Sequence, residues 1–207
     1  MAEERLKPSE VGTLANSYKS ESRTSENAWL YTHDSDFVSK LDERISNFMC
    51  IPYHAALYEA MQVVRYTPGQ QFKCHYDFFQ KEHSTTNEAV AHFEGVNRLL
   101  TFFIYLKNAE EGGETGFCKS VVDPSLYKNG KDCDGIFKAK PNEGDVIFWY
   151  NLKPQFSSIK QLLQPEVNSE HSGCPVKQGT KIGANYWIYN KHPSGHALGQ
   201  QHGFIRG

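Results

Sequence analysis

The sequence predicts a mainly β protein of the α+β class, with strands in a double-sheet β-sandwich or jelly roll and one supporting helix near the N-terminus. Several apolar segments have the length and β-branched or aromatic content of strands, turn residues separate them, and helical spacing occurs in one early stretch. At 207 residues, 39% hydrophobic and 13% aromatic, the chain is long enough for one substantial core. We therefore expect a single domain over residues 1–207, with its core at about 58–190.

The expected helix follows a polar, mixed stretch at residues 1–33. Asp34, Ser35 and Asp36 offer N-cap side chains, and Pro52 ends the helical pattern. The apolar side chains between them recur at three- or four-residue spacing: Val38, Leu41, Ile45 and Phe48. This stripe predicts a helix that packs on a sheet.

Five segments have strand character: residues 59–67, 72–78, 98–106, 146–150 and 180–189. The 98–106 segment is apolar on both faces, which suits the centre of a sandwich. The 146–150 segment, Val-Ile-Phe-Trp-Tyr, is expected to be a core strand. Gly and Pro turns separate these segments, for example Thr67 to Gln70 and Glu110 to Gly116.

Two regions between strands have a different composition. Residues 79–97 are rich in Lys, Glu, His, Ser, Thr and Asn, which is typical either of a substrate-binding flap or of a disordered excursion. Residues 191–207 contain Pro193, Gly195 and Gly199, so we expect a flexible tail rather than a helix there. Histidines in these two regions are interpreted as surface residues: His83, His92, His192, His196 and His202.

Composition excludes several function classes. A formal net charge of −2 gives no basic field of the kind that nucleic-acid binding requires. No apolar run approaches the length of about 18–20 residues that a membrane-spanning helix needs.

The five cysteines form no CxxC pair, which argues against a zinc ribbon or a disulfide-built fold. Two states of the cysteines stay open: either Cys118 and Cys133 are bridged around a polar loop, or all five are thiols.

The strongest chemical signal is a pair of metal-binding side chains two residues apart. In a strand, His75 and Asp77 emerge on the same face. Alone, this pattern is more often an accident or an ordinary polar contact. With His171, however, it supplies two histidines and one carboxylate, the facial triad of non-haem Fe(II) oxygenases, which leaves positions open for a co-substrate and O₂.

A lysine ten residues beyond His171 adds a second element. Lys181 lies in an apolar strand, and a buried lysine is costly unless an anion pairs with it. Its expected partner is a carboxylate of a bound organic acid, with hydrogen bonds from Tyr66, Tyr105 and Thr101 on neighbouring strands. The alternatives without a ligand are that Lys181 is a surface lysine on a strand and that Tyr66 and Tyr105 are ordinary core residues.

The candidate residues lie within a longer series of motifs. In chain order these are Arg23-Thr24-Ser25, Val64-Arg65-Tyr66-x-x-Gly69-Gln70-x-x-x-x-His75-x-Asp77-Phe78-Phe79, Arg98-Leu99-x-Thr101, Tyr105-Leu106 with Glu110-Glu111-Gly112-Gly113-Glu114-Thr115, Lys140-Pro141-x-x-Gly144-Asp145, His171-x-Gly173-Cys174-Pro175-Val176, Gly179-Thr180-Lys181 and Trp187-Ile188. Motifs in this order resemble the prolyl 4-hydroxylase catalytic domain of the collagen-type and plant or algal enzymes, within the Fe(II)/2-oxoglutarate dioxygenases. The resemblance covers roughly residues 8–190.

The resemblance implies a double-stranded β-helix core with Fe(II) bound by His75, Asp77 and His171. It further implies that Lys181 binds the distal carboxylate of 2-oxoglutarate, helped by Tyr66, and that Trp187 lies close to the metal. The activity implied is peptidyl-proline 4-hydroxylation, which consumes O₂ and 2-oxoglutarate, releases succinate and CO₂, and uses ascorbate as reductant. The implied partner is a proline-rich or collagen-like peptide, which is already extended as polyproline II.

The sequence departs from the family pattern in three places. The chain begins late in the family's N-terminal helix, so no targeting segment is seen; a family member in a eukaryote would be expected in the endoplasmic reticulum. Ile182 stands where a Trp is usual, and Tyr186 where a second lysine is frequent. These changes affect packing more than chemistry.

Several alternatives stay open at this level. Arg98 and Glu114 are candidate peptide contacts, and a structural ion pair or a turn role suits them equally well. The 79–97 and 114–134 segments are the expected walls of the peptide groove. The competing functions are a related dioxygenase acting on another residue, an inactive peptide-binding jelly roll, and a zinc hydrolase, for which we find no general-base carboxylate.

Overall fold

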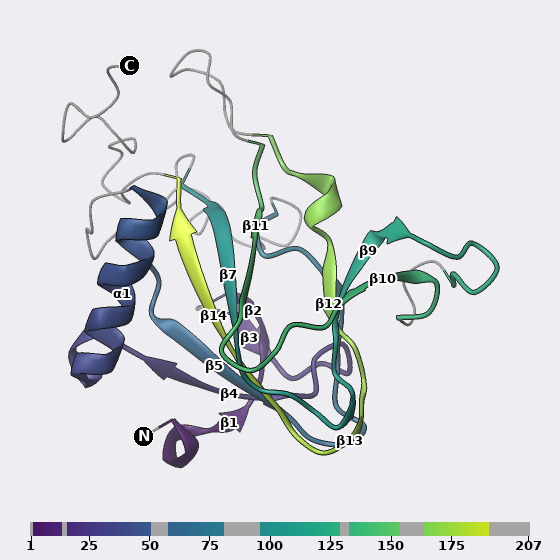
Figure 1. The fold of residues 1–207 in the computed structure, drawn as a ribbon, viewed down its shortest axis with the longest axis horizontal. Coiled ribbons are helices and arrows are strands. Elements are labelled where there is room, and N and C mark those ends of the chain that lie inside the picture. The colour runs from purple at the N-terminus through teal and green to yellow at the C-terminus, as the bar shows by residue number, and fades with distance from the viewer. Residues whose placement is uncertain are drawn as a thin grey trace.

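The structure is a computed structural model, and it describes residues 2–13, 16–50, 58–80, 96–128, 133–153 and 164–190. Two antiparallel sheets dominate it (Figure 1). The major sheet has six strands, in the spatial order β1 (Lys7–Pro8), β4 (Glu26–Leu30), β5 (Met61–Tyr66), β14 (Lys181–Tyr189), β7 (Arg98–Lys107) and β11 (Val146–Tyr150). The minor sheet has four strands, in the order β10 (Ile136–Ala139), β9 (Thr115–Val121), β12 (His171–Gly173) and β6 (Phe72–His75).

Shorter elements complete the fold. β8 (Glu111–Gly112) pairs with β13 (Val176–Gln178), and β2 (Val11–Thr13) pairs with β3 (Asn16–Tyr18). Among the described residues the helices are α1 (Asp36–Met49) and three 3₁₀ turns: η1 (Glu3–Arg5), η2 (Thr32–Asp34) and η5 (Val167–Ser169). None of the helices among these described residues is long and apolar enough to cross a membrane.

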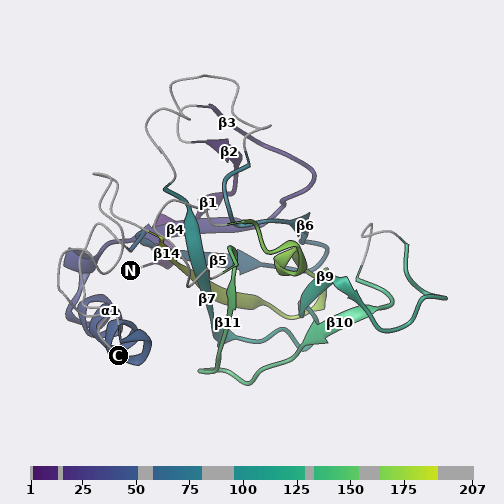
Figure 2. The same ribbon diagram turned by 90° about the horizontal axis from the view of Figure 1, so that it is seen from above.

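The path of the chain confirms the predicted jelly roll. From β5 onward the chain passes repeatedly between the sheets: β5, β7, β11 and β14 lie in the major sheet, and β6, β9, β10 and β12 lie in the minor one. Figure 2 shows the minor sheet facing the major one across the interior. Every strand pair in these sheets is antiparallel, as expected for this architecture.

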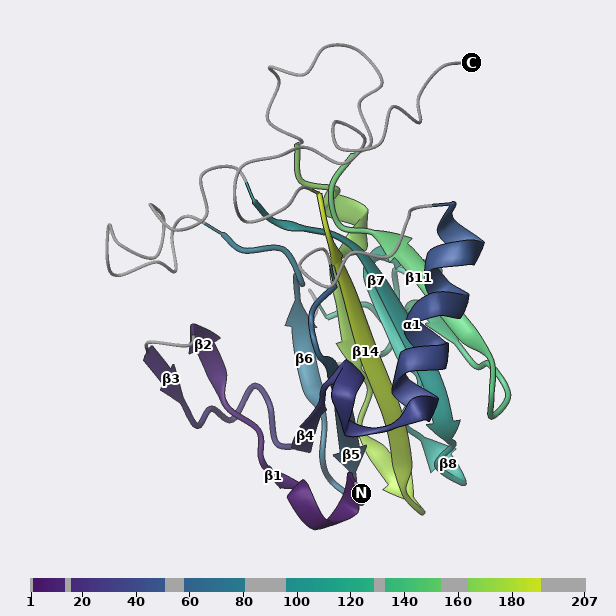
Figure 3. The ribbon, with the colours of Figure 1, turned by 90° about the vertical axis from the view of Figure 1, so that its left-hand side faces the viewer.

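The major sheet is buried on both faces, which explains the apolar character of its central strands. On one face it packs against α1, as Figure 3 shows, through a core that includes Val38, Ile45, Leu100 and Ile188. The other face packs toward the minor sheet through an aromatic-rich cluster: Val64, Tyr66, Phe103, Tyr105, Trp149 and Val176. The helix therefore supports the sheet from outside, and the site lies between the sheets.

One glycine allows this interior to close. A Cβ atom at Gly183 of β14 would lie 2.3 Å from the ring of Phe103 on β7. The absence of a side chain at this position lets the aromatic ring lie directly on the neighbouring strand.

The helix begins as predicted and ends earlier. The Ser35 hydroxyl accepts a hydrogen bond from the Val38 amide at 3.3 Å, a normal N-cap contact. The helix ends at Met49, where Cys50 adopts the left-handed conformation with φ of 53°, shortly before Pro52, which lies outside the described residues. Phe48 is mostly exposed, although its ring contacts Phe102 and Phe148.

Three strand predictions need correction. The N-terminal stretch described as polar contains β4, which pairs with β5 because Ala28 and Leu30 alternate inward. The 146–150 segment is not a core strand: β11 is the edge of the major sheet, and of its side chains only Trp149 is fully buried. The 72–78 strand ends at His75, so Asp77 lies just beyond it rather than within it.

Both predicted states of the cysteines are wrong. Disulfides join Cys74 to Cys118 and Cys133 to Cys174, while Cys50 is a free, exposed thiol. Pairing by sequence proximity failed because the sheet brings together residues 44 and 41 positions apart. The hydrophobic cores still span both faces of the major sheet, so the disulfides reinforce the fold rather than replace its core.

Some predictions concern residues outside the described ranges. They include most of the 79–97 flap, positions 129–132 of the 114–134 wall, and the whole of the 191–207 tail.

Candidate metal centre

Three side chains converge between the sheets, two from neighbouring strands and one from the segment that follows one of these strands. β12 pairs with β6 so that His171 lies directly opposite His75. Asp77 follows β6 by two residues, and its carboxylate lies 3.8 Å from Nε2 of His75 and 3.6 Å from Nε2 of His171. One ligand atom from each of the three lies within 4.8 Å of the others. The structure thus brings together the residues that the sequence selected.

Backbone hydrogen bonds orient both imidazoles. Nδ1 of His75 lies 2.8 Å from the carbonyl oxygen of Lys73, and Nδ1 of His171 lies 2.8 Å from that of Ser169. A carbonyl only accepts, so each Nδ1 carries the proton and each Nε2 presents its lone pair to the cluster. This is the arrangement that a metal-ligating histidine needs.

A buried chain of hydrogen bonds holds the carboxylate. The Thr101 hydroxyl donates to Oδ2 of Asp77 at 2.7 Å, and the side-chain amide of Asn151 donates to that hydroxyl at 2.8 Å. Nε1 of Trp149 in turn donates to the Asn151 side chain at 3.0 Å. Asn151 and Trp149 were missed in the sequence, because nothing in the local pattern shows that they lie next to Thr101 on β7.

The electrostatics favour a cation among these three groups. Burial, followed by the neighbouring His171, lowers the pKa of His75 to about 3, so its imidazole is neutral at physiological pH. Burial acts to raise the pKa of Asp77, but the two histidines and Arg98 outweigh it and lower that pKa to about 2. Two imidazoles and one carboxylate match the donor set of a divalent first-row metal site with open positions.

Trp187 also borders this cluster. It lies on β14 opposite Thr101; its buried indole Nε1 makes no hydrogen bond of normal geometry to the residues that the structure describes, but its interaction with the Asp77 carboxylate helps to lower the pKa of that group. Buried donors are normally satisfied, by a ligand or water if not by protein. The residues present therefore fit a site that binds a metal together with a polar co-substrate.

Lys181 is buried in the same interior. It is 2% exposed, its Nζ lies 3.5 Å from the Thr115 hydroxyl, and the rings of Phe103 and Tyr105 surround it at 4.9 and 5.2 Å. Burial lowers its pKa to about 7, an effect that nearby Glu114 partly opposes. No salt bridge to Lys181 exists among the described residues, so its charge is available to an anionic ligand.

The predicted tyrosines lie beside this lysine. Tyr66 on β5 lies directly opposite Lys181 in the strand register, and Tyr105 hydrogen-bonds Thr115. Burial raises the pKa of Tyr105 to about 12, which keeps its phenol protonated as a donor. The two phenols and the Thr115 hydroxyl can therefore accompany the ammonium group in binding a carboxylate.

Arg98 and Glu114 have structural partners. Arg98 forms a two-pronged ion pair with Glu59 at 2.6 and 2.8 Å, stacks on Trp187 at 3.6 Å, and reaches the Asp77 carbonyl. Glu114 pairs with Lys140 at 3.1 Å. The structure thus shows the ion-pair alternative for both, and their contact with a peptide stays a prediction.

Arg23 is a neighbour whose placement the sequence did not indicate. Its guanidinium lies 4.7 Å from the Phe72 ring, which stacks on His75 at 3.5 Å, and it donates to Gln62. Burial lowers the pKa of Arg23. Its position in the Arg23-Thr24-Ser25 motif was the available signal.

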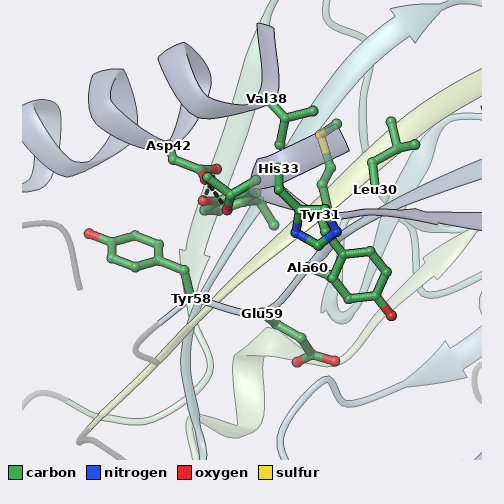
Figure 4. A pocket seen from close by; sticks show the side chains of 11 residues that line it. Leu30, Tyr31, His33, Val38, Asp42, Tyr58, Glu59 and Ala60 are labelled. Carbon is green, nitrogen blue, oxygen red and sulfur yellow. Dashed lines mark hydrogen bonds between the residues drawn. The ribbon is translucent and has the colours of Figure 1, made fainter. Parts of the chain in front are cut away.

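A separate cavity of about 350 Å³ lies between η2, α1 and the start of β5, away from the three candidate ligands (Figure 4). Asp42 inside it accepts hydrogen bonds from Thr32 and Tyr186, and Glu59 at its edge binds Arg98. Its acidic groups are already bonded within the protein, so the cavity has no evident ligand chemistry.

Comparisons with known proteins agree with this geometry. Residues 61–189 match the 2OG-Fe(II) oxygenase superfamily. The probable prolyl 4-hydroxylase 7 of Arabidopsis thaliana is 31% identical over 181 residues, which are 84% of this chain and 51% of that protein. Prolyl 4-hydroxylase 2 of the same plant is 32% identical over 197 residues, 91% of this chain and 60% of that protein. The chain therefore spans between half and three fifths of the length of these relatives.

Solved structures are similar as well. The viral collagen prolyl hydroxylase of Paramecium Bursaria Chlorella virus-1, in its 2OG complex, aligns with a TM-score of 0.57 and 30% identity, over 81% of this chain and 79% of that chain. A Pseudomonas putida prolyl-4-hydroxylase aligns with a TM-score of 0.52 at 13% identity, which shows a shared fold.

A jelly roll with two histidines and one carboxylate converging between its sheets is the architecture of a non-haem iron oxygenase. The chain belongs to the 2OG-Fe(II) oxygenase superfamily, in its prolyl 4-hydroxylase branch. Members of this superfamily use Fe(II), 2-oxoglutarate and O₂.

Proposed function

We propose that this chain is the catalytic domain of a peptidyl-proline 4-hydroxylase acting on proline-rich or collagen-like peptides. It couples oxidation of 2-oxoglutarate to succinate and CO₂ with insertion of one oxygen atom of O₂ at C4 of a proline. The observation that carries the proposal is the pairing of an open three-ligand cluster with a buried lysine that has no acidic partner among the described residues.

In this proposal His75, Asp77 and His171 hold Fe(II), which supplies the O₂ chemistry when bound. The Nδ1 hydrogen bonds fix the two rings, and Thr101 fixes the carboxylate, so the ligand atoms keep their geometry without rearrangement.

Lys181 binds the distal carboxylate of 2-oxoglutarate. Its ammonium group and the Thr115 hydroxyl lie side by side, and Tyr66 and Tyr105 line the same interior. The surrounding aromatic rings exclude water, which strengthens a charge-assisted hydrogen bond. A dicarboxylate extending from Lys181 toward the candidate metal centre is thereby oriented from one end, which leaves its keto acid end for the metal.

Two further components belong to the proposal. The substrate is an extended peptide, because a polyproline II segment is ordered before it binds and loses little entropy. Ascorbate is the expected reductant that restores Fe(II) after turnovers that do not hydroxylate a peptide.

The test is a single turnover. The protein is loaded with Fe(II) and 2-oxoglutarate without oxygen, then exposed to O₂ with a proline-rich peptide or with the same peptide in which alanine replaces proline. We expect succinate release to rise with the proline peptide alone, with a mass gain of one oxygen atom and 4-hydroxyproline on hydrolysis. The His75→Ala protein should release none.

The other outcomes are equally informative. Succinate without peptide modification would keep the oxygenase and remove the proline substrate. Metal binding without succinate would favour a peptide-binding jelly roll that has lost catalysis.

A further inference from the structure

The minor sheet has two disulfides, and one of them adjoins a proposed metal ligand. Cys74 immediately precedes His75 on β6, and its disulfide partner Cys118 lies on β9. The other disulfide joins Cys133, outside the strands, to Cys174, three residues beyond His171. The two bonds therefore differ in how directly they act on the proposed metal centre.

His75 needs support that His171 does not. β12, which carries His171, lies inside the sheet and pairs with β6 on one side and β9 on the other. β6 is the last strand of the minor sheet and is four residues long. On its outer side, among the described residues, it is bonded only to the short stretch 22–24, through the Lys73 amide and a Phe72–Arg23 bridge, and its pairing with β12 contains a register shift. The His75 side chain is 20% exposed, compared with 7% for His171. Edge strands with few ladder hydrogen bonds open most readily.

The orientation of His75 depends on a very short segment. The carbonyl of Lys73 accepts the Nδ1 hydrogen bond, and the Phe72 ring stacks on the imidazole at 3.5 Å. Cys74 lies between these residues and His75. A covalent bond at Cys74 therefore restrains the backbone that sets both the position and the tautomer of His75.

The disulfide connects this segment to the far side of the His171 strand. β6 and β9 flank β12, and the Cys74–Cys118 bond joins them directly, with a Cα–Cα distance of 6.2 Å. Cys118 follows Phe117, which lies opposite His171 in the register, and the Cys118 amide donates to the Glu170 carbonyl. One covalent bond thus ties the edge strand to the backbone around the second histidine.

We infer that Cys74 and Cys118 are positioning residues for the metal centre, and that breaking their disulfide weakens metal binding. This inference rests on the proposed function, because it takes His75 as a metal ligand. Cys74 is partly exposed, so a small dithiol has access to the bond. Two electrons and two protons from the dithiol convert the disulfide into two thiols, and the dithiol becomes a disulfide. The same chemistry makes metal affinity respond to redox conditions.

The experiment compares the two disulfides in a Cys50→Ser background, which removes the exposed free thiol and prevents exchange. Anaerobic titration with Co(II), followed by its visible absorption, measures affinity and coordination geometry without turnover. We expect Cys74→Ala with Cys118→Ala to weaken Co(II) binding by about tenfold, the effect typical of losing a group that orients a ligand. The matched control, Cys133→Ala with Cys174→Ala, should bind Co(II) within about twofold of the background protein.

A second measurement covers the case in which the first double variant does not fold. The Cys133→Ala/Cys174→Ala protein keeps only the disulfide of interest, and its Co(II) affinity is measured along a series of dithiol to oxidised-dithiol ratios. Affinity should fall as this bond is reduced and return on reoxidation, with the far-UV circular dichroism unchanged.

The outcomes separate this inference from the function on which it rests. Equal Co(II) affinity with and without the Cys74–Cys118 bond, or equal losses from both disulfide pairs, would overturn the positioning role. A background protein whose Co(II) binding survives His171→Ala would instead contradict the proposed metal centre.

Discussion

The two sheets of this protein have different tasks. The major sheet has six strands, is covered by α1 on one face, and builds the apolar core. The minor sheet has four strands of at most seven residues, carries both candidate histidine ligands, and is reinforced by two disulfides. The larger apolar core is thus built on one sheet, and both candidate histidine ligands lie on the other. A substitution should affect either unfolding or ligand binding according to whether its side chain faces α1 or the interior between the sheets.

The largest effect is expected where a ligand is removed from the minor sheet. His171→Ala should weaken Co(II) or Fe(II) binding by more than about 100-fold, because loss of a ligand exceeds the 10- to 100-fold typical of its supporting groups. Calorimetric titration without oxygen measures this. His33→Ala, outside the site, is the matched control; a metal affinity that His171→Ala leaves unchanged would place the metal elsewhere.

Lys181 lies on the major sheet but faces the site, and it should affect co-substrate binding alone. Lys181→Ala should raise the KM for 2-oxoglutarate on the order of 100-fold, as expected when one partner of a buried charge pair is lost. Metal affinity should stay unchanged. Lys177→Ala, an exposed lysine paired with Glu111, should leave the KM for 2-oxoglutarate unaltered. A Lys181→Ala protein with normal KM would contradict the assignment.

The pH dependence follows from the same lysine. Burial lowers the pKa of Lys181 to about 7 in the ligand-free protein, below its ordinary 10.5. Affinity for 2-oxoglutarate should therefore fall as pH rises above about 7, by up to tenfold per pH unit, with proton uptake on binding. The stability of the ligand-free protein follows the opposite trend. Between these two pKa values Lys181 is protonated in the unfolded chain but neutral in the folded protein, so its contribution makes the free energy of unfolding rise with pH.

The two trends can be measured separately. Calorimetry in buffers of different ionisation enthalpy reports the proton uptake, and denaturant unfolding without ligand reports stability. Lys181→Met should remove both trends. A 2-oxoglutarate affinity that is flat from pH 6 to 9 would show that the lysine stays charged in the free protein.

A smaller effect is expected for the hydrogen bond that crosses from the major sheet to the carboxylate. Thr101→Val keeps the side-chain volume but removes the donor to Asp77, so metal affinity should fall by about tenfold. Thr24→Val, at an exposed position, is the control. If Thr101→Val lowers the melting temperature without changing metal affinity, the hydroxyl serves packing alone.

The smallest effect concerns the outer support of the major sheet. Ser35→Ala removes the N-cap of α1 and should reduce the free energy of unfolding by about 1 kcal/mol. Metal and 2-oxoglutarate affinities should not change, since α1 lies on the face of the sheet away from the site. Denaturant unfolding and Co(II) titration on one preparation measure both. A change in metal affinity would show that the two layers are more tightly coupled than their packing indicates.

Sequence reasoning worked where the information was local. The strands β7 and β14, the N-cap of α1 and the turn between Thr67 and Gln70 all follow from residue type and spacing, and the structure has them. Sequence reasoning failed where the environment of a residue depends on segments that are far away in the sequence. β11 is as apolar as a core strand, but its position at a sheet edge is set by the order of strands.

The residues of the site divide in the same way. His75, Asp77, His171 and Lys181 were chosen from the sequence because their chemistry and the order of the surrounding motifs are specific. The hydrogen bond from Asn151 to Thr101 joins residues 50 positions apart, and the disulfide between Cys74 and Cys118 joins residues 44 positions apart. No local pattern indicates such contacts.

The sequence by itself determined the fold class and the family, and it selected the side chains that we propose carry the chemistry, because residue type and periodicity can be read without knowing how the chain folds. Only the tertiary structure decided how each side chain is held: His171 by a strand paired on both sides, His75 by a short edge strand beside a disulfide, and Lys181 by an apolar interior that lowers its pKa. Burial and neighbours are set by contacts between segments far apart in the chain, and these exist only once the sheets have formed.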